Sequence, residues 1–368
     1  MVDAGGFAPL YNKQGEIKFE MLLESFRQMR YDALSIGTRE MLMQRDTYNA
    51  VKKLKASRVP RATLNIAFQG KRLRTKPLII RRGGVRIGVV SFFVDDHIPE
   101  AAKQYWAIDD PEQTAEAALT YTRKKADLVV AMLYGDMSQV SAFKKKHEGI
   151  DIVILSHCLA PLETPVEVNG SLLLCAGCEG KFLGRVDASR LGGSWSFTNE
   201  FIPLDRTIPR DPLLTKTYEE YLERVTRLSE EITQQEEDEL AVQFPPVVQA
   251  TDCRSCHNDL YSAWAKTPHA HAIESLTKKN EHRNPECILC HTTYYLTGGF
   301  ISLEKTPEYA GIQCAQCHGR MEGHIEFHSG TFQKGDAPPF ANQDICLHCH
   351  TPDLDDDFDF ERDKKLVH

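Results

Sequence analysis

The sequence of 368 residues has no uninterrupted apolar run of about 18 residues, which excludes a transmembrane helix. It has no excess of basic residues either. The 44 Lys and Arg face 52 Asp and Glu, and the formal net charge of −8 argues against a nucleic-acid-binding protein. No basic segment, apolar segment and cleavage site follow one another at Met1, so no export signal is recognised there. The composition is that of an ordinary globular protein, and the length predicts two domains.

Cysteine has an unusual distribution, because most of the 11 cysteines lie in four copies of C-x-x-C-H near the end of the chain. This pattern is the attachment signature of c-type haem. The two thiols form thioethers with the porphyrin vinyl groups, and the adjacent histidine supplies the proximal nitrogen to the iron. We therefore predict four covalently bound haem c groups. Their attachment residues are Cys253, Cys256 and His257; Cys287, Cys290 and His291; Cys314, Cys317 and His318; and Cys346, Cys349 and His350.

Zinc is the alternative ligand for paired cysteines at this spacing. A zinc site has no need of a histidine directly after every second cysteine, and all four pairs have one. Haem is therefore favoured over zinc or disulfides. Because haem is attached to this motif outside the cytoplasm, we expect an exported protein, periplasmic or extracellular, whose signal segment is not in the numbered chain.

Three further cysteines, Cys158, Cys175 and Cys178, precede the motifs. An exported protein can form a disulfide among them, but their spacing does not select the pair. We expect them to be small buried residues.

The first 205 residues alternate between helical and strand patterns. The predicted helices cover residues 19–30, 39–55, 111–125 and 137–146, and the predicted strands cover residues 63–68, 85–93, 128–133, 150–155, 171–174 and 195–201. Near-continuous apolar strands indicate a sheet covered on both faces. Residues 1–205 are therefore predicted to form an α/β domain with helices layered on a sheet.

The rest of the chain divides into a connector and a cysteine-rich domain. Residues 206–248 are predicted as a helical connector, whose charged helix over residues 212–240 ends before Pro245 and Pro246. Residues 249–368 are rich in cysteine and histidine and show few strand patterns. So short a segment around four haems has little room for a side-chain core. We expect a mainly α-helical or irregular domain whose interior is porphyrin.

Several segments of this domain resemble the cytochrome c-554 family of tetrahaem electron carriers. They are residues 253–276, which include Trp264 and Thr267, residues 311–319, His324, and the tail of residues 357–368. The resemblance covers about residues 250–368 and implies three distal iron ligands. These are His324 for the first haem, His368 for the third, and His269 for another haem, the fourth.

The same resemblance implies that the second haem has an open coordination position. Four histidines depart from the family pattern or add to it, and whether one of them closes that position is left open: His271, His282, His328 and His348. Trp264 and Thr267 are expected to pack against porphyrin, to hold a ligand histidine, or to be ordinary core residues. The acidic cluster of Asp353, Asp355, Asp356, Asp357 and Asp359 lacks the glycine and register of a calcium loop, so no calcium site is predicted.

Four segments of the first domain resemble metallophosphoesterases of the 5′-nucleotidase type. They are residues 3–7, 31–40, 151–159 and 175–185, and the resemblance covers about residues 1–205. That family uses two metal ions to activate water for attack on a phosphate ester. Gly6 replaces an expected aspartate, Thr38-Arg39 replaces an asparagine-histidine pair, and His157-Cys158-Leu159 keeps one histidine of two. The earliest ligand-bearing strand would precede Met1. The resemblance therefore implies the fold with a catalytically inactive scaffold.

The favoured interpretation is an exported tetrahaem c-type cytochrome that transfers electrons between redox partner proteins through closely packed haems. The alternative is a multihaem redox enzyme that acts on a small nitrogen compound at an open second haem, with Cys287, Cys290 and His291 at its centre. A surviving phosphoesterase is the least favoured interpretation. Assembly into an oligomer or filament is compatible with the sequence and is not demonstrated by it.

Overall fold

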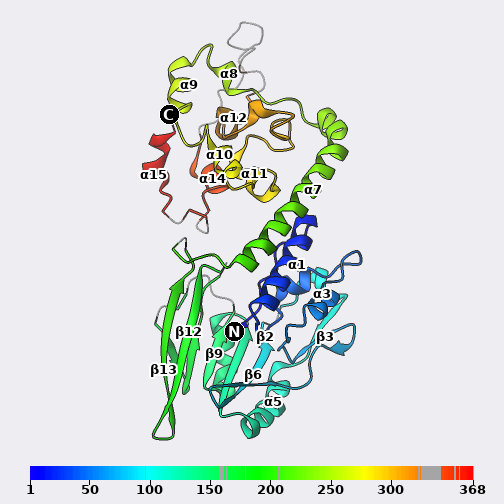
Figure 1. Cartoon of the computed structure of the whole chain (residues 1–368), viewed down its shortest axis with the longest axis vertical. Coiled ribbons are helices and arrows are strands. Elements are labelled where there is room, and N and C mark those ends of the chain that lie inside the picture. Colours follow the sequence, from blue (N-terminus) through cyan, green and yellow to red (C-terminus); the bar gives the residue numbers. More distant parts are fainter. Residues whose placement is uncertain are drawn as a thin grey trace. The chain divides into compact units, whose positions relative to one another are not determined.

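The computed structural model describes residues 1–95, 97–156, 161–162, 164–178, 180–205, 207–321, 324, 341–351, 354–355 and 357–367, without the side chains of residues 191 and 232–242 (Figure 1). The chain forms two compact units, Met1–Tyr221 and Leu222–His368. The division falls inside helix α7 (Pro212–Gln243), which belongs to the predicted connector. Among the described helices, none has both the length and the apolar character needed to cross a bilayer.

A six-stranded mixed sheet forms the centre of the first unit (Figure 1). Its strands, in spatial order, are β10 (Val166–Val168), β11 (Ser171–Leu174), β9 (Ile152–Leu155), β8 (Leu128–Tyr134), β6 (Val85–Phe93) and β5 (Leu78–Arg82). The four inner strands are parallel, and the two edge strands run antiparallel to their neighbours. Every residue of β8 is buried, which confirms the prediction of a sheet covered on both faces.

Two separate apolar clusters cover the faces of this sheet. Phe92 and Leu133 pack with helices α5 (Pro111–Lys125) and α6 (Met137–Lys146). The next residues along the same strands, Phe93 and Tyr134, pack with helices α1 (Lys13–Gln28) and α3 (Ala50–Ala56). Because successive side chains of a strand point to opposite faces, the unit has helices on both sides of the sheet. The predicted α/β layering is confirmed.

The smaller elements complete the first unit. Strands β1 (Val2–Asp3) and β2 (Ala33–Leu34) form a parallel pair, and β4 (Lys71–Arg72), β3 (Ile66–Phe68) and β7 (Trp106–Ile108) form a three-stranded sheet in that order. The remaining short helix is α4 (Glu100–Lys103).

The helix predicted over residues 39–55 is wrong, because two helices occupy this segment. Helix α2 (Thr38–Leu42) ends early, and α3 begins only after Asn49, whose side chain accepts a hydrogen bond of 2.8 Å from the Lys52 amide. An asparagine in this role starts a helix and does not continue one.

The prediction also missed β12 (Phe182–Leu191), which pairs with β13 (Ser194–Pro203) in a long hairpin. Its turn is built from Gly192 and Gly193, both with positive φ, and a Gly-Gly pair is a signal of such turns.

The cysteines of the first unit differ from the prediction. Cys175 is buried as expected, but it is disulfide-bonded. Cys178 is exposed, so the expectation of a small buried residue is wrong there. Cys158 lies outside the described residues, as does His157.

Glu40 lies at the start of α2 and is fully buried. Its carboxylate accepts hydrogen bonds from the backbone amides of Gly6 (2.9 Å), Ala8 (2.7 Å) and Gly37 (2.7 Å). Burial raises the pKa of this carboxyl group, and the three backbone donors oppose that shift. The side chain therefore joins the loop after β1 to the loop before α2.

Beyond α7, the described part of the second unit consists of short helices and irregular chain, as predicted for residues 249–368. The helices are α8 (Ala250–Cys253), α9 (Asn258–Trp264), α10 (Ala272–Thr277), α11 (Pro285–His291), α12 (Cys314–His318), α14 (Gln343–Leu347) and α15 (Phe360–Asp363), with 3₁₀ turns at Pro307–Tyr309 and Lys364–Leu366. Its cluster of buried apolar residues is small and centres on Ile273, Leu276, Ile288 and Phe300.

Replacement of Glu40 by alanine is expected to lower the free energy of unfolding of the first unit by about 3 kcal/mol or more, because three buried amides lose their acceptor. Glu40→Gln keeps one oxygen acceptor and should lose less. Urea denaturation followed by circular dichroism measures the change. Glu100→Ala is the control, because the Glu100 side chain is 88% exposed and pairs only with Lys103 in its own helix. Equal denaturation midpoints for Glu40→Ala and Glu100→Ala would contradict this role.

Candidate haem centre

Each C-x-x-C-H motif forms about one turn of helix. In the first motif the His257 amide donates to the Cys253 carbonyl (2.8 Å), and in the fourth the His350 amide donates to the Cys346 carbonyl (2.9 Å). The second and third motifs lie within α11 and α12. Residues three and four apart share one face of a helix, so each turn presents both thiols and the imidazole on the same side.

Thiols of different motifs lie near one another in pairs. The neighbouring Cys314 raises the pKa of Cys253, and Cys253 lowers that of Cys314. Cys349 likewise lowers the pKa of Cys290 to about 6.

The third and fourth motifs are also neighbours. The pKa of Cys317 is raised mainly by burial and, to a smaller extent, by the nearby Cys346 thiol. The motifs therefore follow one another in space in the order first, third, fourth, second.

The first motif has a second imidazole ring opposite its own. The rings of His257 and His324 have centroids 6.4 Å apart and planes inclined by 17°. A bond between a metal and an imidazole nitrogen is about 2 Å long, and the ring centre lies about 1 Å further, so two rings on opposite sides of one iron have centroids roughly 6 Å apart. The separation suits one iron between these histidines.

The fourth motif has a similar arrangement with His269. The rings of His269 and His350 have centroids 5.9 Å apart, inclined by 58°. Burial, and then the proximity of His350, lowers the pKa of His269, so this ring is neutral near pH 7 and keeps a lone pair for a metal.

The backbone of His269 is held closely. Its carbonyl accepts from the Ile312 amide (2.8 Å), and the Trp264 indole donates to the Ile312 carbonyl (2.8 Å). Gly311 has φ +80°, and a Cβ there would lie 2.5 Å from the Ala270 carbonyl oxygen. Trp264 thus holds the segment that carries His269, which is one of the roles expected for it. Thr267 donates its hydroxyl to the Trp264 carbonyl (2.7 Å).

The second motif lacks a facing ring among the described residues. The Nδ1 atom of His291 lies 2.8 Å from the Ala272 carbonyl oxygen and 3.2 Å from the Ser275 hydroxyl. No other imidazole of the described part of the chain forms a ring contact with His291, in contrast to the first and fourth motifs.

The remaining histidines of the sequence prediction have varied surroundings. Both ring nitrogens of His271 are engaged, with the Glu274 carboxylate (2.9 Å) and the Ala265 carbonyl (3.0 Å). His282 lines a cavity of about 170 Å³, and within the described residues its buried Nδ1 has no hydrogen-bond partner. His348 is exposed, next to Cys290. His328 and His368 lie outside the described residues.

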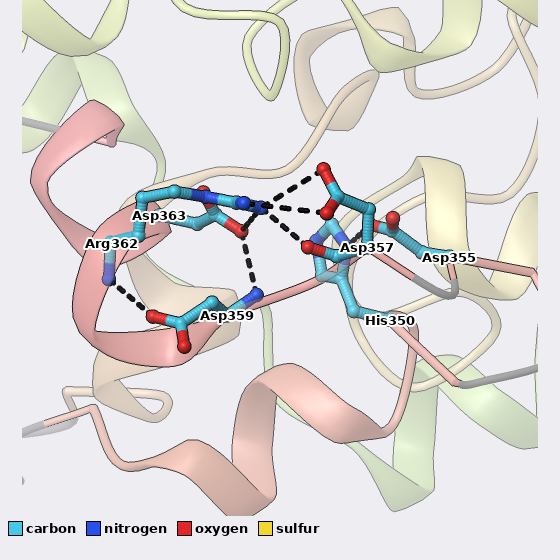
Figure 2. A network of polar contacts seen from close by, with 6 residues as sticks. All are labelled: His350, Asp355, Asp357, Asp359, Arg362 and Asp363. Carbon is cyan, nitrogen blue, oxygen red and sulfur yellow. Dashed lines mark hydrogen bonds and ion pairs between the residues drawn. The ribbon is translucent and has the colours of Figure 1, made fainter.

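The sequence analysis missed the contact of Asp355 with His350, because it treated Asp355 only as part of an acidic cluster. Figure 2 shows the Asp355 carboxylate directed at the His350 ring, with 2.6 Å between Oδ2 and Nδ1. The Phe358 ring stacks on His350 at 4.5 Å. Arg362 forms ion pairs with Asp357 of the same cluster and with the nearby Asp363. The bond to Arg362 lowers the pKa of Asp363 to about 2. Asp353 and Asp356 lie outside the described residues.

The residues of the four motifs fit the haem groups that the motifs imply. None of the eight motif cysteines is in a disulfide bond, and His257 and His350 each have a partner ring at a suitable separation. Leu260 and Leu289, beside the first and second motifs, are 51% and 57% exposed. Apolar side chains of this kind are suited to contact a porphyrin. No group of three His, Cys, Asp or Glu side chains in the described residues is arranged to hold a bare metal ion.

Gly6 and Thr38, which the sequence analysis matched to metal-ligand positions of the phosphoesterases, lie next to Tyr134. Its hydroxyl forms a hydrogen bond of 2.6 Å with Thr38, and its ring stacks on Phe93 at 5.0 Å. A Cβ on Gly37 would lie 2.0 Å from this ring, and one on Gly6 would lie 3.5 Å from it. An aromatic ring therefore lies between the two loops. The sequence analysis missed Tyr134, although it ends a buried strand whose carboxyl end faces these loops.

Comparison with known proteins gives two different matches. The Cytochrome c554 and c-prime family matches residues 252–319. The sulfate thiohydrolase SoxB of Thermus thermophilus is similar in structure, with a TM-score of 0.53, 19% identity, and coverage of 61% of this chain and 42% of that one. A 5′-nucleotidase precursor, also from Thermus thermophilus, has a TM-score of 0.51 and 17% identity, with coverage of 62% and 50%. None of the curated proteins matches the chain.

The chain spans half or less of the length of these two structures, and identities this low establish only the fold. The cytochrome family implies covalently bound haem c. The chain therefore joins a unit with the metallophosphoesterase fold of the 5′-nucleotidases to a C-terminal unit whose residues 252–319 match the Cytochrome c554 and c-prime family.

Proposed function

We propose that this chain is an exported tetrahaem c-type cytochrome that transfers electrons between redox partner proteins. One haem would be attached to each C-x-x-C-H motif. The observation that supports the proposal is the proximity of the motif thiols, because thiols of different motifs shift one another's pKa: Cys253 with Cys314, Cys317 with Cys346, and Cys349 with Cys290. Four attachment turns in one series suit a relay better than four isolated sites.

The protein residues hold and orient the cofactors. His257 and His324 would ligate the first iron, and His350 and His269 the fourth, with Trp264 and Gly311 fixing the backbone of His269. When bound, the haems supply reversible one-electron redox chemistry. Two histidines on an iron leave no position for a substrate, which favours a carrier.

The exported location has independent support in the first unit. The disulfide bond of Cys175 is typical of an oxidising compartment. Periplasmic and extracellular sites agree equally with this observation. The acidic chain, with net charge −8, suits partners that present basic surfaces. Assembly into an oligomer or filament remains part of the proposal without a contact that favours it.

We infer that the first unit is a scaffold without phosphoesterase activity. Metal-activated hydrolysis needs several ligands on two ions at once, and Tyr134 and Thr38 meet in the space between the loops that bring Gly6 and Gly37 together. The fold alone does not confer activity.

A second candidate function is redox catalysis on a small nitrogen compound at the second motif. The observation that favours it is the difference between His291 and the histidines of the first and fourth motifs. His257 and His350 each have a second ring nearby, whereas His291 has none among the described residues. An iron with one protein ligand would keep a position for a substrate.

Replacement of His324 by alanine is expected to change about one quarter of the iron from low-spin to high-spin, because one haem of four loses its distal ligand. Low-temperature electron paramagnetic resonance measures the fraction. His271→Ala is the matched control, because both nitrogens of that ring are already engaged by protein acceptors. The ligand assignment fails if the two variants give the same spectrum, and a protein without four haem additions in its mass would overturn the proposed function.

Carbon monoxide distinguishes the two candidate functions. If the second haem is open, the reduced protein should bind one carbon monoxide for four haems, and His291→Met should alter the spectrum of that complex because the ligand opposite it changes. Optical titration gives the stoichiometry. A protein that binds no carbon monoxide would exclude the open site and leave the carrier function.

Hydrolysis of 4-nitrophenyl phosphate and of adenosine monophosphate should stay at the blank level with Mn²⁺, Mg²⁺ or Zn²⁺ added, because the first unit lacks the ligand set. A colorimetric phosphate assay checks this, with an active 5′-nucleotidase as positive control under the same conditions. Metal-dependent release of phosphate above the blank would show that the first unit is an enzyme.

A further inference from the structure

We infer that the contact of His350 with the Asp355 carboxylate gives the haem of the fourth motif a lower reduction potential than the haem of the second motif, whose His291 contacts a backbone carbonyl. The inference rests on the proposed attachment of haem to these motifs. Asp355 would be a positioning residue, because it touches His350 and not the iron.

The contacts of His350 leave one ring nitrogen for a metal. Nδ1 donates to Oδ2 of Asp355 over 2.6 Å (Figure 2). The Phe358 ring lies against the imidazole, with the two planes inclined by 17°. The ring therefore cannot rotate without loss of both contacts. Nε2 is the remaining nitrogen, and the histidine that immediately follows the second cysteine is the one expected to bind iron.

The Asp355 carboxylate contacts His350, and the nearby Arg362 forms its ion pairs with other carboxylates. Arg362 places Nε 2.6 Å from one oxygen of Asp363 and a terminal nitrogen 2.9 Å from the other, and it also pairs with Asp357 at 3.4 Å. Among the described residues, Asp355 forms an ion pair with no Lys or Arg, and His350 is its partner.

A carboxylate acceptor has a predictable effect on a metal-bound imidazole. Hydrogen bonds with one charged partner are roughly twice as strong as neutral ones. A ligand histidine that donates to a carboxylate gives more electron density to its metal, and this favours the oxidised, more positive iron. His291 donates to the neutral carbonyl of Ala272, so its iron receives less. With other ligands equal, the fourth haem should have the lower potential.

The exposed fractions limit the size of the effect. The side chains of His350 and Asp355 are 33% and 41% exposed, so water screens part of the charge. Loss of an outer-shell partner of a metal ligand typically changes metal affinity or activity by about tenfold to a hundredfold. Because of the screening, we expect the lower value, about tenfold, for the ratio of oxidised to reduced iron. A tenfold change in the ratio of oxidised to reduced iron corresponds to about 59 mV for a one-electron couple.

The test is a redox titration of the full haem-loaded chain with Asp355→Asn, which keeps a hydrogen-bond acceptor and removes the charge. One of four midpoint potentials should rise by about 59 mV, the shift that a tenfold change gives, while the other three stay unchanged. Asp357→Asn is the matched control: it removes the same charge from the same segment, its side chain is 88% exposed, and it does not contact His350. An equal shift in the control, or no shift in Asp355→Asn, overturns the inference.

A second variant keeps the test decisive if Asp355→Asn does not incorporate its haems. Asp355→Glu keeps the negative charge and should keep the low potential; a rise as large as that expected for Asn would count against the inference. Haem stoichiometry by mass is measured first on the unchanged protein. Fewer than four haems would contradict the proposed function, whereas four haems with unchanged potentials in Asp355→Asn would contradict only the role of Asp355.

Discussion

The second unit depends on the spacing of two thiols and an imidazole along one turn of helix. Cysteines three residues apart and a histidine one residue later share a helix face, so each motif presents a complete attachment set without help from distant residues. A large side-chain core is then unnecessary, and beyond α7 the described part of the unit has short helices and a small apolar cluster. What the fold must supply is the placement of one turn beside another, which the contacts from Cys253 to Cys314 and from Cys349 to Cys290 describe.

The first unit is stabilised in a different way. Helices cover both faces of the mixed sheet, and apolar clusters fill each interface. Glu40 joins the loops at the carboxyl end of the sheet through backbone amides, an arrangement that needs no metal. Tyr134 packs between these loops. Because none of these contacts uses a metal ion, the fold of this unit would not depend on the metal ligands that the proposed function takes to be replaced.

Sequence patterns predicted what short-range spacing determines. The haem motifs, the buried strand β8 and the helix α5 follow from residue types within a few positions of one another. The division of residues 39–55 into two helices was missed because it depends on the Asn49 cap. The contacts of Tyr134 with Thr38 and of Asp355 with His350 were missed for another reason. Each depends on a side chain orientation that the fold decides, across 96 residues in the first case.

The four motifs share only their two cysteines and the histidine, so differences among the proposed haems have to come from the other residues around them. The structure shows one such difference in what each imidazole Nδ1 meets. The His291 ring faces a backbone carbonyl, and the His350 ring faces a carboxylate. The segment that holds this carboxylate is acidic and mostly exposed, and its Arg362 neutralises Asp357 and Asp363 but leaves Asp355 for the histidine. If haems are bound as proposed, a charged segment that composition alone assigns to the solvent would therefore give one of them a different potential from the others.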